Sequence, residues 1–528
     1  MPTLIINGKE VTVDKGTTVL NAAKKAGIDI PVFCYHDGLS ISANCRMCLV
    51  EAEMNGRKFR NPVPACHTMA SDGMVIETEN DKIKDIRKGV LEFLLLNHPI
   101  DCPICDKAGE CMLQDQYIGY SGEESRLEHP KVHKVKATSI GKHVMLDSER
   151  CILCSRCVRF TAEITKTDEM MIFNRSNHAE IGVFPDAPLD NDYSLCVTDI
   201  CPVGALTSKD FRFKKRTWFL SEAKSICTKC SKGCNISLES DNGELYRVKP
   251  LKNLDVNQYW MCDEGRTLTK EINESRLVAP IFNKEELSLK EGLNKLKDLL
   301  TTYKKNKVGV IISASNSTEN TFAIKHFFKD FLGVESFYML AKKDGEGDDL
   351  LKQVDKNPNR RGVKLALANN YKEMDVDLIV KKHELVIIFG TDLKKCAIAK
   401  LNKAKHLVVL GTNKNILTDI AEVSYPVLSF AEETGTFINE DNRMQRFFPM
   451  NLSITERPTA KGVMNVVPSR MNLSPTFKVV SKLAKEMGYD LELDNIFDIM
   501  KIMKDEIEVL KDFKYKDLGK NGLIIEGL

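Results

Sequence analysis

The sequence of 528 residues lacks the features that mark several common classes of protein. No apolar run approaches the roughly 18 residues needed to cross a bilayer, and pieces such as 93–96 and 385–389 are far too short. A formal net charge of +2 gives no reason to expect binding to nucleic acid or to an anionic membrane surface. The first 13 residues suggest a pair of strands and not a signal peptide. These absences predict a cytoplasmic protein.

Nucleotide-binding motifs are missing as well. Neither GxGxxG nor a P-loop occurs, so no dinucleotide or nucleoside-triphosphate site is predicted. The triplets 390–392 (GTD) and 411–413 (GTN) each follow an expected strand, which is where α/β folds bind ligands. Such triplets are also common strand-to-helix turns, and we interpret both in that way.

Cysteine, in contrast, is abundant and unevenly placed. Of the seventeen cysteines, only Cys396 lies beyond residue 262. Disulfide frameworks belong mostly to short secreted proteins, whereas clustered cysteines in a large cytosolic chain indicate metal ligation. Fifteen of the cysteines and one histidine form four sets of four candidate ligands.

The first set follows a predicted β-hairpin at Asn7-Gly8 and a predicted helix that Thr17 or Thr18 caps and Gly27 ends. Its spacing is C-x10-C-x2-C-x17-C, with a longer first gap than the plant-type ferredoxin pattern. We interpret it as a 2Fe–2S site, and a zinc site is the alternative. The ligands are Cys34, Cys45, Cys48 and Cys66.

The second set lies in NHPIDCPICDKAGEC, directly after a predicted helix at 81–97. It consists of His98, Cys102, Cys105 and Cys111. His98 is either a cluster ligand or a cation near the end of that helix. Since no fourth cysteine follows until Cys151, we favour the ligand interpretation. A neutral imidazole in place of a thiolate should raise the reduction potential of the cluster.

The third set begins with Cys151, Cys154 and Cys157, spaced as in bacterial ferredoxins. The expected fourth cysteine and proline are replaced by Thr161 and Ala162, and a Cys-Pro pair occurs instead at 201–202. The predicted 4Fe–4S ligands are therefore Cys151, Cys154, Cys157 and Cys201. A nearby rival, Cys196, is interpreted as a small buried side chain.

The fourth set has the spacing C-x2-C-x3-C-x27-C, and a predicted hairpin with Asp241-Asn242-Gly243 at its turn brings the last cysteine back. A zinc ribbon and a 4Fe–4S site are both compatible with this spacing, and the neighbouring sets favour the cluster. The candidate ligands are Cys227, Cys230, Cys234 and Cys262.

From about residue 276 the sequence changes in character. Apolar runs at 308–312, 385–389 and 406–410 alternate with helical stretches at 317–332 and 476–487. This alternation predicts a parallel sheet with crossover helices.

Three arginines, Arg150, Arg156 and Arg159, surround the third set. They could tune a reduction potential or pair with carboxylates of a partner protein. Because arginine is mostly exposed in folded proteins, we predict surface positions for all three.

The order of these motifs resembles the large iron–sulfur subunit of bacterial respiratory complex I. The match is dense over residues 1–266 and rests on the second set together with RCILCSRCVRF, CPVGAL and WMCDEGR. Two later segments, SASNSTENT (313–321) and EETGTFINEDNRMQ (432–445), resemble fragments of the molybdopterin-oxidoreductase fold, which the family carries in degenerate form.

The resemblance implies α+β ferredoxin-like modules followed by a truncated α/β molybdopterin-oxidoreductase-like domain, because only 266 residues follow Cys262. The expected domains are a β-grasp 2Fe–2S domain (1–80), a histidine-plus-cysteine 4Fe–4S segment (81–125), a 4Fe–4S ferredoxin-like domain (135–215), a 4Fe–4S domain of molybdopterin-oxidoreductase type (220–275) and the degenerate α/β domain (276–528).

The same resemblance implies one 2Fe–2S cluster, three 4Fe–4S clusters and no molybdopterin. In the family, electrons pass from flavin-bearing NADH-oxidising subunits toward downstream iron–sulfur subunits and quinone, at the inner face of the cell membrane. The fourth cluster occurs in only some members and lies off the main path. The expected function is electron relay within NADH:quinone oxidoreductase, with no catalytic residue and no NADH or quinone site in this chain.

Three other classes of protein share part of this pattern. Iron-only hydrogenases have similar N-terminal modules but need further cysteines, and only Cys396 follows the fourth set. An NAD-linked molybdenum or tungsten formate dehydrogenase needs a metal–pterin site, for which Cys396 is the only thiol candidate; its helical context favours a packed side chain. A multi-zinc scaffold would be colourless, whereas iron–sulfur clusters absorb visible light.

Overall fold

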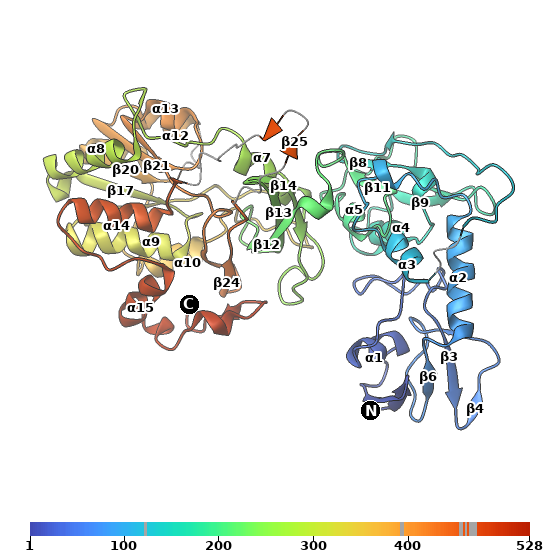
Figure 1. The fold of residues 1–528 in the computed structure, drawn as a ribbon. Coiled ribbons are helices and arrows are strands. Elements are labelled where there is room, and N and C mark those ends of the chain that lie inside the picture. The colour runs from blue at the N-terminus through green and yellow to red at the C-terminus, as the bar shows by residue number, and fades with distance from the viewer. Residues whose placement is uncertain (121–123, 391–394, 453–457, 460–461, 464–471) are drawn as a thin grey trace. The chain divides into compact units, whose positions relative to one another are not determined.

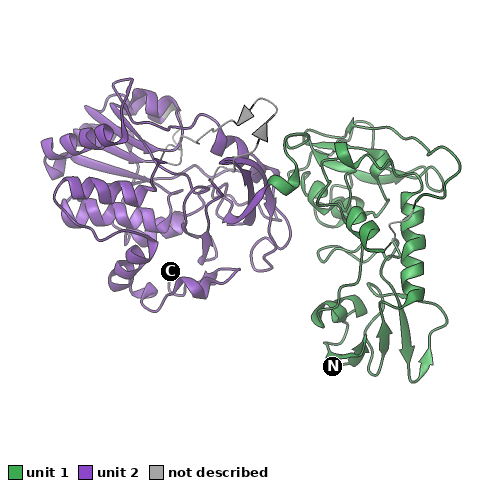
Figure 2. Ribbon diagram, in the orientation of Figure 1, with its two compact units in different colours: residues 1–219 green, residues 220–528 purple. Residues whose placement is uncertain are grey.

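The computed structural model describes the chain except for residues 121–123, 391–394, 453–457, 460–461 and 464–471. The chain divides into two compact units, residues 1–219 and residues 220–528 (Figure 2). Within the described ranges, no helix has both the length and the apolar character that crossing a bilayer requires.

The N-terminal unit begins with a six-stranded sheet in the order β2-β1-β6-β3-β4, with β5 paired to β3 (Figure 1). The predicted hairpin is confirmed, and Asn7 and Gly8 form its turn with φ of 47° and 77°. The predicted helix is confirmed too, since the Thr18 side chain accepts the N–H of Asn21 at its start. The elements are β1 (Thr3–Ile6), β2 (Lys9–Thr12), α1 (Val19–Lys25), β3 (Leu49–Met54), β4 (Arg57–Lys58), β5 (Val63–Pro64) and β6 (Val75–Glu77).

The rest of this unit consists of short elements joined by long loops. Helix α2 ends at Leu95, two residues before the predicted end. Arg87 lies on its buried face and is 0% exposed, with Nη1 3.0 Å from both Glu79 Oε1 and Tyr120 Oη. The elements are α2 (Asp81–Leu95), α3 (Met112–Tyr120), β7 (Thr138–Ser139), β8 (Val144–Leu146), α4 (Arg156–Glu163), β9 (Met170–Phe173), β10 (Glu180–Val183), α5 (Cys196–Ile200) and β11 (Leu206–Ser208).

The C-terminal unit opens with a three-stranded antiparallel sheet, β12 (Ser221–Ile226), β13 (Asn235–Asp241) and β14 (Glu244–Pro250). Asn242 and Gly243 join the last two strands with φ of 51° and 75°, which confirms the predicted hairpin. Helices α6 (Asp263–Arg266) and α7 (Leu268–Asn273) follow.

An eight-stranded sheet dominates residues 276–528, in the order β16-β15-β22-β21-β20-β17-β18-β19 (Figure 1). The six strands from β22 to β19 are parallel, as the alternating pattern predicted, while β15 and β16 form an antiparallel edge. The strands are β15 (Ile281–Phe282), β16 (Glu285–Glu286), β17 (Val308–Ser313), β18 (Phe337–Leu340), β19 (Lys372–Glu373), β20 (Leu385–Phe389), β21 (His406–Gly411) and β22 (Val423–Pro426).

Helices cover both faces of this sheet, which explains why its central strands are continuously apolar. Successive residues of β20 lie in two different apolar clusters. Ile387 belongs to a cluster with side chains of α8, α9, α14 and α15, and Ile388 belongs to a cluster with side chains of α11, α12 and α13. The predicted helix at 317–332 is α9 continued by a π-helical segment, His326–Phe331. The helices are α8 (Leu289–Thr302), α9 (Thr318–Lys325), α10 (Arg360–Ala366), α11 (Val376–Lys382), α12 (Lys395–Leu401), α13 (Ile416–Ile420), α14 (Thr476–Glu486) and α15 (Ile496–Glu506).

A smaller antiparallel sheet in the order β23-β24-β27 completes the described fold, with the pair β25-β26 apart from it. Its strands and that pair are β23 (Gly435–Ile438), β24 (Arg443–Phe447), β27 (Leu523–Ile524), β25 (Pro458–Thr459) and β26 (Gly462–Val463). The side chain of Cys396 and part of the 390–392 triplet lie outside the described residues, so the predictions made for them stay predictions.

Candidate metal centres

The first set gathers its four thiols at the loop end of the six-stranded sheet. Cys48 Sγ lies 3.3 Å from Cys66 Sγ, and Cys34 shares a hydrogen bond with Cys45. The Cys34 thiol is an electrostatic neighbour of both Cys48 and Cys66, so the two pairs lie close together. Four sulfurs in one small volume are suited to holding a metal centre.

Donors from the backbone are directed at these sulfurs. Cys34 accepts hydrogen bonds from the Cys45 thiol and from the backbone N–H groups of Cys45 and Asn44. These hydrogen bonds lower the pKa of Cys34 to about 5, although burial alone would raise it. Ala43 and Arg46 have positive φ, 49° and 62°, in the loop between Cys34 and Cys48. A loop of this shape turns N–H groups inward and forms a concavity for a negatively charged group.

The second set lies between α2 and α3. His98, Cys102 and Cys111 line one cavity, and the Cys105 and Cys111 thiols interact electrostatically. Burial lowers the pKa of His98 to about 4, so its imidazole is neutral and a ring nitrogen is free to bind a metal. These features fit a site with one imidazole and three thiolates.

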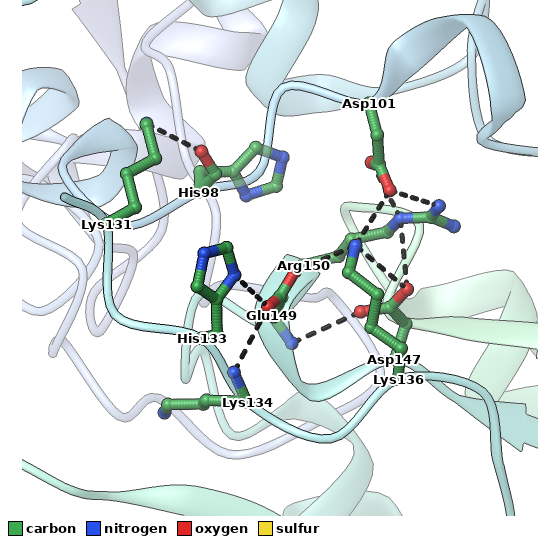
Figure 3. Close-up of polar contacts among 9 residues, drawn as sticks. All are labelled: His98, Asp101, Lys131, His133, Lys134, Lys136, Asp147, Glu149 and Arg150. Carbon is green, nitrogen blue, oxygen red and sulfur yellow. Dashed lines mark hydrogen bonds and ion pairs between the residues drawn. The ribbon is translucent and has the colours of Figure 1, made fainter.

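A polar network lies beside His98 and Asp101, at the start of the second set (Figure 3). Arg150 donates to both carboxylate oxygens of Asp101, at 2.9 and 2.6 Å, and Lys136 Nζ lies 3.0 Å from the same carboxylate. Although burial opposes the effect, these two cations lower the pKa of Asp101 to about 2. Lys131 donates to the carbonyl of His98 at 2.7 Å. The network ties the residue before Cys102 to the residue before Cys151.

The third set is enclosed by apolar side chains. Its four cysteines line one cavity with Leu146, Val203 and Leu206. Burial raises the pKa of Cys151 to about 12 and that of Cys154 to about 11, and it raises the Cys157 pKa well above its usual value. Thiols in such surroundings are protonated, so binding a metal ion would release protons from them.

Cys201 and Cys196 occupy different positions around this set. Cys201 is an electrostatic neighbour of all three other thiols, Cys151, Cys154 and Cys157. Cys196 is the first residue of α5 and is 0% exposed, as a small buried side chain would be.

The turn after Cys201 presses against the second set, which the sequence did not reveal. A Cβ atom at Gly204 would lie 2.1 Å from the sulfur of Cys105, so only glycine fits there. The CPVGAL turn therefore packs one set of candidate ligands directly against another.

The predicted surface positions of the arginines are wrong for Arg150 and Arg156, which are 4% and 6% exposed. Arg159 is half-buried. The reason for Arg150 is its carboxylate partner Asp101, which is 49 residues away in the chain. Arg156 and Arg159 instead donate to backbone carbonyls of the first set's loop, more than a hundred residues earlier.

The fourth set lies beside the three-stranded sheet of the C-terminal unit. Cys227 directly follows strand β12, and Cys234 directly precedes strand β13. The backbone N–H of Cys227 donates a 2.9 Å hydrogen bond to the carbonyl of Cys234. Cys262 is the N-cap of α6, and burial raises its pKa to about 11. The Cys234 thiol is an electrostatic neighbour of the other three, so these four donors also converge.

Protein-family models match the same four regions. They are a 2Fe-2S iron-sulfur cluster binding domain at residues 2–81, an NADH-ubiquinone oxidoreductase-G iron-sulfur binding region at 87–126, the ferredoxin-like domain of NADH-quinone oxidoreductase subunit 3 at 141–207 and a molybdopterin oxidoreductase Fe4S4 domain at 220–274. Each match contains the candidate ligands of one set.

Curated relatives are similar over most of the chain. The G subunit of NADH-quinone oxidoreductase from Rickettsia felis is 36% identical over 400 residues, 75% of this chain and 56% of that protein. The mitochondrial NADH dehydrogenase [ubiquinone] iron-sulfur protein 1 of Solanum tuberosum is 38% identical over 327 residues, 61% of this chain and 44% of that protein. The chain thus spans about half the length of the curated relatives it matches.

A solved NAD+-reducing [NiFe]-hydrogenase in the H2-reduced state is matched over 41% of this chain and 91% of that chain, with 28% identity. Its TM-score of 0.36 is too low to support an argument about the fold. The sequence relatives and the four domain matches agree with one another. Over these iron–sulfur domains the chain is similar to the G subunit of NADH-quinone oxidoreductase.

Proposed function

We propose that the chain is the iron–sulfur electron-relay subunit of an NADH-quinone oxidoreductase. The observation that carries this proposal is the convergence of four sets of donors, each inside a region matched by an iron–sulfur domain. The names of the relatives support the assignment to the NADH-oxidising complex. The chain's own role would be to hold electron carriers, so no residue is assigned as a base or a nucleophile.

The proposed cofactors are one 2Fe–2S cluster, held by the first set, and three 4Fe–4S clusters, held by the other three sets, with no molybdopterin. In the second set His98 serves as a ligand and not as a cation at the end of α2. The proposed domain limits are 1–80, 81–125, 135–215, 220–275 and 276–528, and the last of these is an α/β domain of molybdopterin-oxidoreductase type.

The residues around each set perform two tasks. Backbone N–H groups donate hydrogen bonds to the sulfurs, for example Leu153 N–H to Cys151 Sγ at 3.4 Å, and so stabilise the thiolate form. Apolar side chains such as Leu146 and Val203 keep water away from the third set. Bound clusters would supply the one-electron oxidation and reduction that the side chains themselves lack.

The proposed partners are flavin-bearing NADH-oxidising subunits on one side and further iron–sulfur subunits on the other. Contact with the membrane would be indirect, through the complex at the inner face of the cell membrane. Four thiolates also suit zinc, so the chemical nature of the metal is the first point to test.

The test uses the full-length chain purified without oxygen. Mixed with flavin-bearing NADH-oxidising subunits, it should lose visible absorbance when NADH is added, whereas the chain alone should need dithionite. A matched Cys230→Ser variant, altered only in the fourth set, should keep NADH-dependent reduction because that cluster lies off the main path. A chain that holds its iron and yet is not reduced by NADH in the mixture would contradict the proposed relay.

A further inference from the structure

Arg156 lies where the loops of three candidate sets meet. It is the first residue of α4, between Cys154 and Cys157. Its Nη2 atom donates to the carbonyl of Tyr35 at 2.6 Å, and Nη1 donates to the carbonyl of Ile200 at 3.0 Å. One planar guanidinium thus joins segments that are far apart in sequence.

Each of its partners adjoins a proposed ligand. Tyr35 follows Cys34 of the first set, and Ile200 precedes Cys201 of the third. A longer contact, 3.8 Å from Nη1 to Met112 Sδ, reaches the residue after Cys111 of the second set. Arg156 therefore contacts the backbone of the first and third loops closely and touches the second only at its edge.

Within the part of the chain that the structure describes, the charge of Arg156 has no carboxylate partner. The side chain is 6% exposed, and among the described residues no acidic oxygen forms an ion pair with it. Its Nε atom is buried without any hydrogen-bond acceptor. Arg150 is buried to the same degree, but its guanidinium is paired with Asp101 and Asp147. Burying a cation without a counter-charge is strongly unfavourable.

The groups able to carry a negative charge near Arg156 are thiols. Its electrostatic neighbours are Cys154 and Cys201 of the third set and Cys34 of the first. Arg159 adds a second cation, with Nη2 2.5 Å from the carbonyl of Cys34 and 3.4 Å from that of Cys154. Thiolates bound to iron and sulfide give a site a net negative charge, which would supply the missing counter-charge.

We propose that Arg156 is a positioning residue whose charge is shared by the first and third clusters and stabilises the reduced form of both. This inference rests on the proposed function, because it needs both sites to hold clusters. Adding an electron makes each cluster more negative, so a nearby fixed cation favours reduction. The same hydrogen bonds keep the two loops together, which fixes the distance over which an electron would pass.

The test compares Arg156→Gln with Arg156→Lys in the full-length chain, purified without oxygen. Reduction potentials are measured by redox titration of the electron paramagnetic resonance signal of each cluster. In Arg156→Gln the potentials of the first and third clusters should both fall, while that of the second should fall less and that of the fourth should stay unchanged. Arg156→Lys keeps the positive charge, so the reduction potentials of the first and third clusters should lie close to those of the wild type.

Equal potentials in the wild type and a fully loaded Arg156→Gln variant would overturn the inference. If Arg156→Gln loses its clusters, the Arg156→Lys variant decides the question. If it retains the first and third clusters at nearly normal potentials, the charge of Arg156 has the proposed role. If it loses both clusters, the hydrogen-bond geometry is what matters, and the inference is overturned. A wild-type chain without any cluster signal would instead refute the proposed function itself.

Discussion

Residues 1–219 and residues 276–528 bury their side chains in different ways. In the second region, every residue of β17 and β20 is buried, and alternate side chains enter apolar clusters on opposite faces of one sheet. In the first region, strands such as β4 and β5 have two residues, and most candidate ligands lie on loops; Cys157 in α4 and Cys102 in a short 3₁₀ helix are the exceptions. The first region also has an apolar cluster, beneath its six-stranded sheet, but the sheet is smaller and most of the candidate ligands lie on the segments that join its short elements.

The loops of the first region also carry backbone strain. Arg46, Ile100, Leu153 and Ser155 all have positive φ, between 52° and 62°, and each lies between ligands of one set. For residues other than glycine this conformation costs roughly 1–2 kcal/mol each. Metal–ligand bonds can offset that cost, because the free energy of metal binding is also folding free energy. The ligand-bearing loops of the first region should therefore need their metal to stay ordered, whereas the second region should not need a metal.

Removal of the metal should give the largest effect and the sharpest contrast. After chelation under reducing conditions, amide hydrogen exchange should become fast in the loops that carry the ligands, within residues 34–48, 98–111 and 151–157. Strands β17, β20 and β21 should keep their protection, because apolar burial holds them together. Equal loss of protection in both regions would remove the distinction.

The complementary experiment leaves the metal sites intact and creates a cavity in the apolar cluster beside the large sheet. Ile387→Ala should destabilise the C-terminal unit by roughly 2–5 kcal/mol, because Ile387 lies in the largest apolar cluster and the cavity left behind cannot fully close. Calorimetry of the full chain measures this loss. The visible spectrum of the first three clusters should stay unchanged, and a change in it would show that the regions depend on one another.

Much of this contrast can be predicted from sequence because it depends on local patterns. Short-range rules predict a helix cap at Thr17 or Thr18, a hairpin turn at Asn7-Gly8 and an apolar strand at 385–389. The structure confirms the turn and the strand, and it identifies Thr18 as the cap. Features that depend on distant residues could not be predicted. Arg156 binds the carbonyl of Tyr35, 121 residues away, so nothing in its local sequence indicates that it is buried.

Candidate ligands fall between these two cases. The cysteine spacings predict which thiols gather, but the identity of the metal and the role of His98 depend on chemistry that spacing does not express. The close packing of Gly204 on Cys105 also went unpredicted, since the two residues belong to different sets.

His98→Cys sharpens the comparison within the first region. An additional thiolate should leave the second cluster bound and lower its reduction potential by on the order of 100 mV, scaled from the effect of two histidines in Rieske centres. Redox titration of its resonance signal measures the shift. His133→Cys is the matched control, because the exposed His133 is hydrogen-bonded to Glu149 and is not a proposed ligand. Identical signals in His98→Cys and the wild type would mean that His98 is not a ligand.

The smallest effect concerns a buried acid of the second region. Burial raises the pKa of Glu433 well above its usual value, and one of its oxygens lacks a hydrogen-bond partner. The folded protein favours the neutral form of Glu433. The stability associated with this neutral form is fully present below the pKa of Glu433 in the unfolded state, and it is lost as the pH rises through the pKa in the folded state. Glu433→Gln should therefore stabilise the unit at pH 7 by roughly 1–3 kcal/mol, with no gain at low pH.

The control for this change is Glu486→Gln, at an exposed position of α14. It should leave the melting temperature unchanged at both pH values. A pH-independent effect of Glu433→Gln would show that Glu433 is ionised in the folded protein.

The central claim, that the front of this chain is organised around iron and sulfide, is tested most directly by metal analysis of the full-length protein purified without oxygen. The account predicts about 14 iron atoms and a similar amount of acid-labile sulfide per chain, from one two-iron and three four-iron clusters, without molybdenum or tungsten. Zinc in place of iron, or a stoichiometric pterin metal, would contradict it.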